Sequence, residues 1–245
     1  MKYTKEYNLV SEAVKNALSN LGNIIIKTKE HDDLVTSTDL FIETRLIEMI
    51  KENFSTDNIL SEEFNNHHDL KERTWIIDPI DGTSNYASGL LIYCVQVALW
   101  ENGSLVFSYI NIPELNKEYY AVKGYGAFLN NNKITLKQNT NLSNALFSFI
   151  GNFRRGKKVP YELIDKAVDL NMKVRVLGSI GVEMALLAEG IISCLYSTIT
   201  NIYDIAPGLL LCQEAGCFIR NEGKYILGES ETFIFNNEKL SNLFK

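Results

Sequence analysis

Two aspartates, Asp78 and Asp81, stand three residues apart at the end of the apolar run Trp75–Ile77. This run predicts a strand that ends at Asp78, because Pro79 lacks the N–H that a continuing strand would donate. A turn at the proline can bring both carboxylates, and the main-chain carbonyl of Ile80, to one point. Hard oxygen ligands of this kind suit Mg²⁺.

The residues after Asp81 favour an anion. Gly82, Thr83 and Ser84 can open a helix, and the free N–H groups at a helix start attract a group such as phosphate. A cation site beside an anion site indicates metal-assisted phosphate chemistry. Asp-Pro-x-Asp-Gly is also a common turn sequence, so the motif alone leaves an ordinary loop as the alternative.

Further acidic residues stand at the ends of other predicted elements. Glu62-Glu63 follows a short apolar run, Asp39 begins a helical pattern, and Asp204 begins another with Pro207 in its first turn. For Asp39 and Asp204 a helix-capping role is the plain alternative.

The sequence resembles the inositol monophosphatase family from its first helix to about residue 220, with several motifs in order and at fitting distances. These motifs are Asp33-Leu-Val-Thr36-x-x-Asp39, Glu62-Glu63, Trp75-x-x-Asp78-Pro-Ile-Asp81-Gly-Thr83-x-Asn85, and Tyr203-Asp204-x-Ala…Glu214-Ala-Gly216. The family belongs to the lithium-sensitive, magnesium-dependent phosphatases that include fructose-1,6-bisphosphatase. The resemblance implies an α/β fold, a layered α-β-α-β-α sandwich, with the site at the junction of its two halves, and a homodimer.

The resemblance also implies roles for single residues. Two or three Mg²⁺ ions would be held by Glu62, Asp78, the Ile80 carbonyl, Asp81 and Asp204. The substrate phosphate would be bound by Asp81, Gly82, Thr83 and Ser84. Asp39 and Thr83 would form a hydrogen-bonded pair that, with Glu62, activates the attacking water, and this agrees with the chemistry expected of carboxylates beside a metal-bound water.

The substrate is less well defined. Ser197 falls where animal inositol monophosphatases have a glutamate that grips the inositol ring, so it is the candidate substrate-binding position. A small polyol or sugar phosphate, first of all inositol monophosphate, is expected. The triplet Ser61-Glu62-Glu63 is favoured by bisphosphate nucleotidases, which keeps 3′(2′),5′-bisphosphates, NADP and fructose 1,6-bisphosphate as alternatives. A weakly catalytic member that serves as a regulatory binding partner is an alternative of another class, although retention of the acidic ligands argues against it.

Several elements must position these residues. Apolar residues at three- and four-residue steps predict helices over about 4–28 and 40–53. Runs rich in β-formers from 94 to 129, joined around Asn102-Gly103, predict a hairpin-rich sheet. Strands then alternate with helices, which indicates a layered α/β arrangement. The whole chain, 1–245, is expected to form one phosphatase unit with subdomains of about 1–145 and 146–245.

The composition excludes several classes of protein. The 245 residues carry 24 Lys plus Arg against 30 Asp plus Glu, a net charge of −6, which argues against a nucleic-acid binder. The short basic run 154–158 reads as a solvated loop, with a subsite for a larger anion or RNA as the alternative. No apolar stretch is long enough to span a membrane. Four widely spaced cysteines without metal-site spacing indicate free thiols and a cytoplasmic protein.

Overall fold

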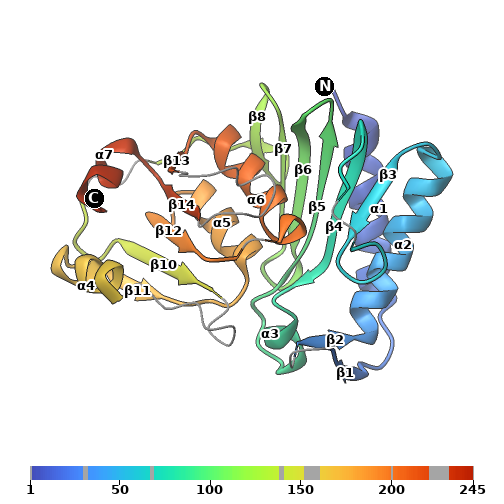
Figure 1. Cartoon of the computed structure of the whole chain (residues 1–245), viewed down its shortest axis with the longest axis horizontal. Coiled ribbons are helices and arrows are strands. Elements are labelled where there is room, and N and C mark those ends of the chain that lie inside the picture. Colours follow the sequence, from blue (N-terminus) through green and yellow to red (C-terminus); the bar gives the residue numbers. More distant parts are fainter. Residues whose placement is uncertain are drawn as a thin grey trace.

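The computed structural model describes residues 2–29, 33–66, 69–137, 141–151, 161–199, 201–220 and 232–244. The basic run 154–158 and the pair His67-His68 lie outside these ranges. The described elements form five layers in the order α-β-α-β-α, as the resemblance implied (Figure 1).

The first two layers are a helix pair and a seven-stranded sheet. Helices α1 (Thr4–Ser19) and α2 (Ser37–Asn53) pack on each other and on one face of the sheet (Figure 1). The strands lie side by side in chain order: β3 (Asn58–Ser61), β4 (Arg73–Asp81), β5 (Cys94–Glu101), β6 (Ser104–Ile112), β7 (Lys117–Val122), β8 (Gly126–Leu129) and β9 (Asn132–Lys133). Only the β3–β4 pair among them is parallel. The confirmed hairpin at Asn102-Gly103 has positive φ at both residues, as such a turn requires.

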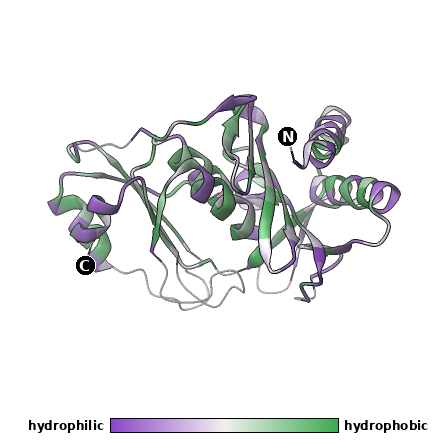
Figure 2. Cartoon of the chain, turned by 90° about the horizontal axis from the view of Figure 1, so that it is seen from above, coloured by the Kyte–Doolittle hydropathy of each residue, from purple (hydrophilic) through white to green (hydrophobic). Residues whose placement is uncertain are grey.

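The remaining layers come from the second half of the chain. Helices α5 (Ile180–Ala188) and α6 (Ile202–Ala215) lie between the two sheets. The second sheet contains, in spatial order, β11 (Lys173–Arg175), β10 (Leu146–Ile150), β12 (Cys194–Ser197), β14 (Thr232–Phe235) and β13 (Phe218–Arg220). Its outer face carries α4 (Tyr161–Asp169), α7 (Glu238–Ser241) and the 3₁₀ turn Asn242–Phe244. Hydrophobic residues gather on the sheets and central helices (Figure 2).

Two short elements complete the fold. Strands β1 (Ile26–Thr28) and β2 (Leu34–Thr36) form an antiparallel hairpin, and the single helix turn α3 (Thr83–Ala87) packs against β2. This region lies at one end of the seven-stranded sheet, below α2 in Figure 1.

The predicted first helix is too long. The helix ends at Ser19, where the Ser19 and Asn20 side chains donate to the carbonyls of Lys15 and Asn16 and so compete with further helical hydrogen bonds. The apolar residues that extend the helical pattern do not face a core, since Ile25 is 59% exposed. The prediction for 20–28 is therefore wrong.

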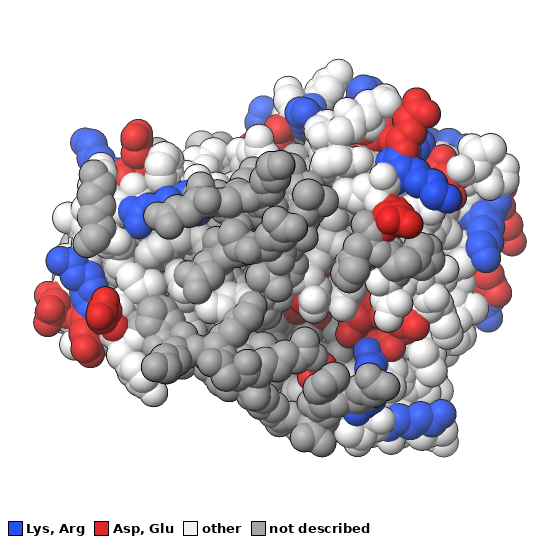
Figure 3. Space-filling model, viewed as in Figure 1, with Lys and Arg blue, Asp and Glu red and all other residues white. Residues whose placement is uncertain are grey.

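The charge distribution matches the acidic composition. On the face shown in Figure 3, the coloured Lys and Arg side chains are interspersed with Asp and Glu instead of forming one basic area. No helix in the described residues is long and apolar enough to cross a membrane.

Candidate active site

A β-bulge on β4 brings Asp78 and Asp81 into one site. The prediction that the strand ends at Asp78 is wrong, because β4 continues through Pro79 to Asp81. Asp78 pairs with Gln96 and Asp81 with Cys94, so two residues of β4 oppose one of β5 between these pairs. In a regular strand a spacing of three would put the two carboxylates on opposite faces. The extra residue resets the alternation, and the two carboxylates interact electrostatically.

The parallel strand β3 delivers Glu62 to the same place. Ser61, the last residue of β3, pairs with Ile77, and the Glu62 N–H donates to the Ile77 carbonyl at 3.2 Å. Because parallel strands end at the same edge, Glu62 comes next to Asp78. The ladder with β3 stops here, so Pro79 can continue β4 without leaving a neighbouring strand short of a donor.

Buried Glu43 on α2 fixes the loop that carries Glu62. It accepts hydrogen bonds from the N–H groups of Glu63 (3.0 Å) and Phe64 (2.8 Å) and from the Ser61 hydroxyl (2.5 Å). Burial raises the pKa of Glu43, and these three donors oppose that rise. Glu43 lies one helical turn after Asp39, on the same face of α2.

Gln96 connects the acidic residues of the two halves. Its amide donates to Asp78 Oδ2 at 3.1 Å and to the main-chain carbonyl of Asp204 at 2.9 Å. Asp204 lies in the first turn of α6, and its Oδ2 accepts from Asn201 at 2.9 Å. The amide group of Gln96 therefore holds the start of α6 against the edge of the first sheet.

The carboxylates of this cluster, which we call the acid cluster (Glu62, Asp78, Asp81 and Asp204), repel one another. Burial, followed by the charges of the other three, raises the pKa of Asp78 well above its usual range. Burial and the charges of Glu62 and Asp81 do the same to the pKa of Asp204. Burial raises the pKa of Glu62 to about 7, although Lys29 opposes the rise. The cluster holds more negative charge than its protein partners compensate.

Lys29 is the positive charge that the structure brings to the cluster. Its ammonium group lies 3.1 Å from Glu62 Oε1 and also contacts Glu63. Lys29 follows strand β1, so the β1–β2 hairpin delivers this cation.

Asp39 and Thr83 lie within hydrogen-bond distance. Thr36 caps α2 by accepting from the Asp39 N–H, and Asp39 Oδ2 accepts from the Thr36 N–H at 2.9 Å, a capping box. Asp39 Oδ1 faces the Thr83 hydroxyl at 3.3 Å, and the same hydroxyl lies 2.9 Å from the Ile80 carbonyl. One hydroxyl proton cannot serve both acceptors equally, and the shorter contact favours Ile80 in this arrangement.

Asp81 is held by residues one hundred positions away in the chain. Its Oδ2 accepts from the Ser179 hydroxyl at 2.5 Å and from the Gly181 N–H at 2.7 Å, both at the start of α5. Gly82 follows with a φ of 92°, and a Cβ there would lie 3.0 Å from Ser179 and 3.1 Å from the Ile92 carbonyl. Only glycine fits this close approach of the two halves.

Ser197 lies apart from these contacts. It ends β12, is fully buried, and its hydroxyl accepts from the Ile199 N–H at 3.0 Å. In the described part of the chain, no hydrogen bond joins it to the acid cluster. A substrate-binding role for Ser197 therefore stays a prediction.

Comparison with known proteins decides the family. A sequence model of the inositol monophosphatase family matches residues 3–243. The chain belongs to this family.

Similar proteins extend that finding. A fructose-1,6-bisphosphatase/inositol-1-monophosphatase of Thermotoga maritima is 32% identical over 208 residues, or 84% of this chain and 78% of that protein. The Nus factor SuhB of Xylella fastidiosa is 28% identical over 223 residues, covering 86% and 80%. A solved IMPase/NADP phosphatase complexed with Mg²⁺ and phosphate has a TM-score of 0.80 at 24% identity, covering 98% of this chain and 91% of that chain, and this likeness concerns the fold. As a member of the inositol monophosphatase family, the protein is a phosphoric monoester hydrolase.

The acid cluster suits the divalent metal expected of this phosphatase family. Within the described ranges, Asp78 Oδ1 and Gln96 Oε1 are buried acceptors without a partner, and four carboxylates that repel one another need a cation. As the side chains stand, no three Asp, Glu, His or Cys residues among those described are arranged to hold an ion. Each carboxylate faces a protein donor instead: Glu62 faces Lys29, Asp78 faces Gln96, Asp81 faces Ser179, and Asp204 faces Asn201. The donor set fits, and the side chains have to reorient to enclose a metal ion.

Sequence reasoning missed the residues that support this family's acidic motifs: Lys29, Glu43, Gln96 and Ser179. Glu43 could have been found, because it stands four residues after Asp39 on one helix. Gln96 is a single polar residue in an apolar strand, and such a residue is a candidate for a buried polar role. No local signal pairs Lys29 or Ser179 with acids that are distant in sequence.

Proposed function

We propose that the protein is a Mg²⁺-dependent phosphomonoesterase that acts on a small polyol or sugar phosphate, with inositol monophosphate as the first candidate. The observation that carries the proposal is the convergence of Glu62, Asp78, Asp81 and Asp204 from three separate elements. Mutual repulsion makes this arrangement unfavourable without a cation. In a protein that binds no metal, four carboxylates that converge in this way would only lower the stability.

The acidic residues would hold two or three Mg²⁺ ions, together with the Ile80 carbonyl. When bound, Mg²⁺ supplies positive charge that stabilises the phosphate oxygens and the leaving oxygen. Gln96 holds Asp78 and the start of α6 next to each other through the two hydrogen bonds of its amide. Ser179 and the Gly181 N–H hold one oxygen of Asp81 and leave the other for the site.

Asp39 and Thr83 would orient the attacking water. If the Thr83 hydroxyl donates to Asp39 Oδ1, which lies 3.3 Å away, its oxygen is left to accept from water. Asp39 is fully buried, and its second oxygen is fixed by the Thr36 N–H. Asp39 is therefore preorganised, the Thr83 hydroxyl has to turn from the Ile80 carbonyl to Asp39, and Glu62 would accept the water's proton. The main-chain N–H groups of Gly82, Thr83 and Ser84 would bind the phosphate oxygens together with Asp81 and its metal.

A panel of phosphorylated compounds tests the proposed substrate class. The name of the Thermotoga relative joins a sugar bisphosphate, fructose 1,6-bisphosphate, with a polyol phosphate, inositol 1-phosphate, which supports assaying both. Phosphate release should be measured with Mg²⁺ on inositol 1-phosphate, fructose 1,6-bisphosphate, 2′-AMP, 3′-phosphoadenosine 5′-phosphate and NADP. We expect the highest kcat/KM with a polyol or sugar monophosphate, and a phosphate release in Asp81→Asn that is lower by about three orders of magnitude or more. A folded protein that releases phosphate from none of these compounds would contradict the proposal.

A regulatory binding role is the second candidate. It is favoured by the pairing of Lys29 with Glu62, which fills part of the acid cluster with a protein cation, and by the name Nus factor carried by one relative. Calorimetric titration with Mg²⁺ separates the candidates. A phosphatase binds the metal at millimolar concentration or below, whereas a regulatory member with a sealed cluster shows no heat of binding.

We also propose that the enzyme is a cytoplasmic homodimer. The four free cysteines support a reducing compartment, and dimerisation is the expectation from the family. Sedimentation velocity at micromolar concentration tests the dimer, and a monomer would refute it.

A further inference from the structure

Helix α3 is a single turn whose orientation depends on its side-chain contacts. None of its five residues, all of which the structure describes, is buried. One turn of helix has little stability of its own, so neighbouring elements must hold it in place. Asn85 attaches α3 to the second half of the chain, because its amide donates to the Ile92 and Leu177 carbonyls at 2.7 and 2.8 Å.

Tyr86 attaches the same turn to the start of α2. Its hydroxyl lies 3.0 Å from the Thr38 hydroxyl, and its ring packs edge-on against Tyr93 with the ring centres 4.8 Å apart. Thr38 stands in the first turn of α2 and is only 4% exposed. Water cannot readily replace the partner of a hydroxyl that is buried in this way, so the bond contributes to holding α3 against α2.

The same two turns carry Asp39 and Thr83. Asp39 follows Thr38 directly in α2. Thr83 precedes Tyr86 by three residues, which places both side chains on one face of α3. The Thr83 hydroxyl lies 3.3 Å from Asp39 Oδ1, beside the contact of Tyr86 with α2. A movement of α3 that breaks the Tyr86 contact would therefore also change the distance between Asp39 and Thr83.

The Thr83 hydroxyl has two acceptors within reach and one proton to donate. It lies 2.9 Å from the Ile80 carbonyl, closer than to Asp39, so a small movement of α3 decides which acceptor takes the proton. We propose that Tyr86 is a positioning residue of the phosphatase reaction. Its bond to α2 holds α3 where Thr83 can donate to Asp39. The inference rests on the proposed function, in which this pair orients the attacking water.

The test compares the kinetics of Tyr86→Phe and wild type with Mg²⁺ and inositol 1-phosphate, or fructose 1,6-bisphosphate where that is hydrolysed faster. The variant keeps the ring and loses only the hydroxyl. The arrangement in which Thr83 reaches Asp39 then loses the stabilisation of one hydrogen bond, so we expect kcat to fall about threefold to tenfold. KM and the affinity for Mg²⁺ should stay within about twofold, because the proposed metal ligands are unchanged. A merely structural role would lower Tm and leave kcat as in wild type.

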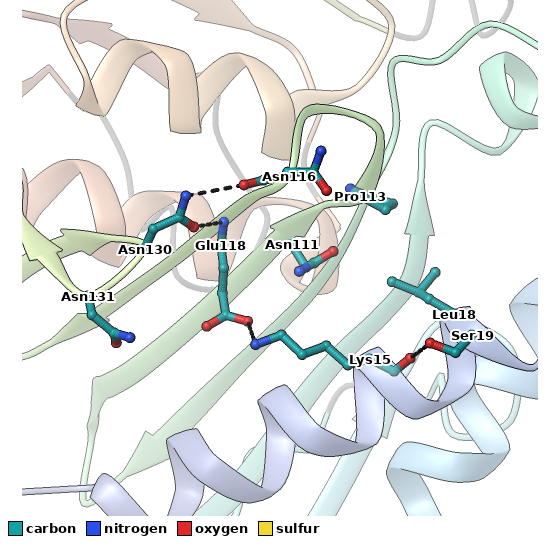
Figure 4. A pocket seen from close by; sticks show the side chains of 9 residues that line it. All are labelled: Lys15, Leu18, Ser19, Asn111, Pro113, Asn116, Glu118, Asn130 and Asn131. Atoms are coloured by element: carbon teal, nitrogen blue, oxygen red, sulfur yellow. Dashed lines mark hydrogen bonds and ion pairs between the residues drawn. The ribbon is translucent and has the colours of Figure 1, made fainter.

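Tyr93→Phe is the matched control, because it removes the hydroxyl of the other ring in the same aromatic pair. The Tyr93 hydroxyl donates to Glu114 at 2.9 Å, in the turn Pro113–Leu115. This turn borders an open groove at the end of α1, where Lys15 pairs with Glu118 and none of the described lining residues belongs to the acid cluster (Figure 4). The kcat of Tyr93→Phe should therefore equal that of wild type, and a loss as large as that of Tyr86→Phe would refute a specific role for Tyr86.

A double-mutant cycle shows whether the effect passes through Thr38. Thr38→Val removes the other hydroxyl with little change in side-chain shape. If the two hydroxyls act through one bond, Tyr86→Phe should lower kcat no further in the Thr38→Val background. The free energies of unfolding of the same four proteins measure the bond without any substrate, and they should show the same lack of additivity.

Three further outcomes would overturn the proposal. The first is a wild-type kcat in Tyr86→Phe while Asp39→Asn has lost activity, in which case the proposed function stands and only the role of Tyr86 fails. The second is a wild-type kcat in both variants, which would remove the water-orienting pair itself from the mechanism. The third is an additive loss of unfolding free energy in the cycle, because the bond between the two hydroxyls would then not form in solution.

Discussion

Glu183 should make the stability of the protein depend on pH, and the size of the effect follows from its surroundings. The side chain lies on α5 and is fully buried. Burial raises the pKa of Glu183 from 4.5 to about 8, while the hydrogen bond from the Leu177 N–H opposes the rise. The folded state therefore binds a proton on Glu183 at pH values where the unfolded chain has released it.

The sign and magnitude follow from linkage. A group whose pKa is raised by folding contributes its full stability below pH 4.5, and this contribution is lost as the pH rises towards about 8. A difference of about 3.5 units, at ~1.4 kcal/mol per unit, corresponds to ~5 kcal/mol across this window. Glu183→Gln keeps an acceptor for the Leu177 N–H, which Glu183 Oε1 binds at 2.7 Å, but it has no proton to lose.

The assay is urea unfolding of wild type and Glu183→Gln at pH 5, 6, 7 and 8 with EDTA present. Because both proteins retain the acid cluster, most of its titration cancels in the difference between them, and the repulsion between Glu183 and Asp81 counts as part of the effect of Glu183. We expect the difference in free energy of unfolding, Glu183→Gln minus wild type, to increase by ~1 kcal/mol per pH unit between pH 5 and 8. Glu162→Gln, at an exposed position of α4, should run parallel to wild type.

Parallel curves for Glu183→Gln and wild type would refute the reasoning, because they would mean that Glu183 titrates alike in the folded and unfolded states. Glu183→Leu gives an independent check on the role of the hydrogen bond. It leaves the Leu177 N–H without its acceptor and should be less stable than Glu183→Gln at every pH by about 1–3 kcal/mol.

Three further predictions concern the acid cluster. Asp81→Asn should lower kcat by about three orders of magnitude or more while circular dichroism shows an intact fold, because the carboxylate charge that would bind metal is lost but the side-chain shape is kept; activity within tenfold of wild type would contradict the assigned role. Lys29→Met should lower the Tm of the metal-free protein by a few degrees and enlarge the rise in Tm on adding Mg²⁺, since Glu62 loses its counter-charge. Lys27→Met on the exposed strand β1 is the control. Equal rises in Tm in both variants would be inconsistent with competition between Lys29 and Mg²⁺ for Glu62. Gln96→Leu should reduce the free energy of unfolding by about 2 kcal/mol, because its amide bonds two groups, one of them a carboxylate; a denaturant curve that overlaps wild type would show that the bridge is not formed in solution.

The sequence predicted elements wherever local chemistry determines them. Asp39 stands at the start of α2, where the sequence placed it, and forms a capping box with Thr36; the hairpin at Asn102-Gly103 follows from two residues that tolerate positive φ. The first helix was predicted too long because Leu21 and Ile25 continue its apolar period. Side-chain hydrogen bonds of Ser19 and Asn20 end the helix instead. A hydrophobicity pattern alone does not show where such hydrogen bonds end a helix.

The bulge at Asp78 and Asp81 could not be predicted, because it depends on a neighbouring strand. Proline normally ends a strand, and it is tolerated here only because β3 stops opposite Ile77. Whether a partner strand is present is a property of the sheet and not of the residues around Pro79. The convergence of the two carboxylates was expected from the motif, but the predicted turn gave the wrong geometry for it.

Several contacts at and around the acid cluster cross between the two halves of the chain. Gln96 of the first sheet holds the start of α6, the start of α5 holds Asp81, and the Asn85 amide donates to the Leu177 carbonyl at 2.8 Å. Asp204 therefore joins the three carboxylates of the first sheet only when the central helices have packed on that sheet, and the repulsion among the four opposes this packing. A bound cation removes the repulsion, so metal affinity and the packing of the two halves are thermodynamically linked. Substitutions that loosen the junction should weaken Mg²⁺ binding even where they touch no ligand, and Asn85, whose amide bonds the Ile92 and Leu177 carbonyls and no carboxylate, is a residue at which both effects can be measured together.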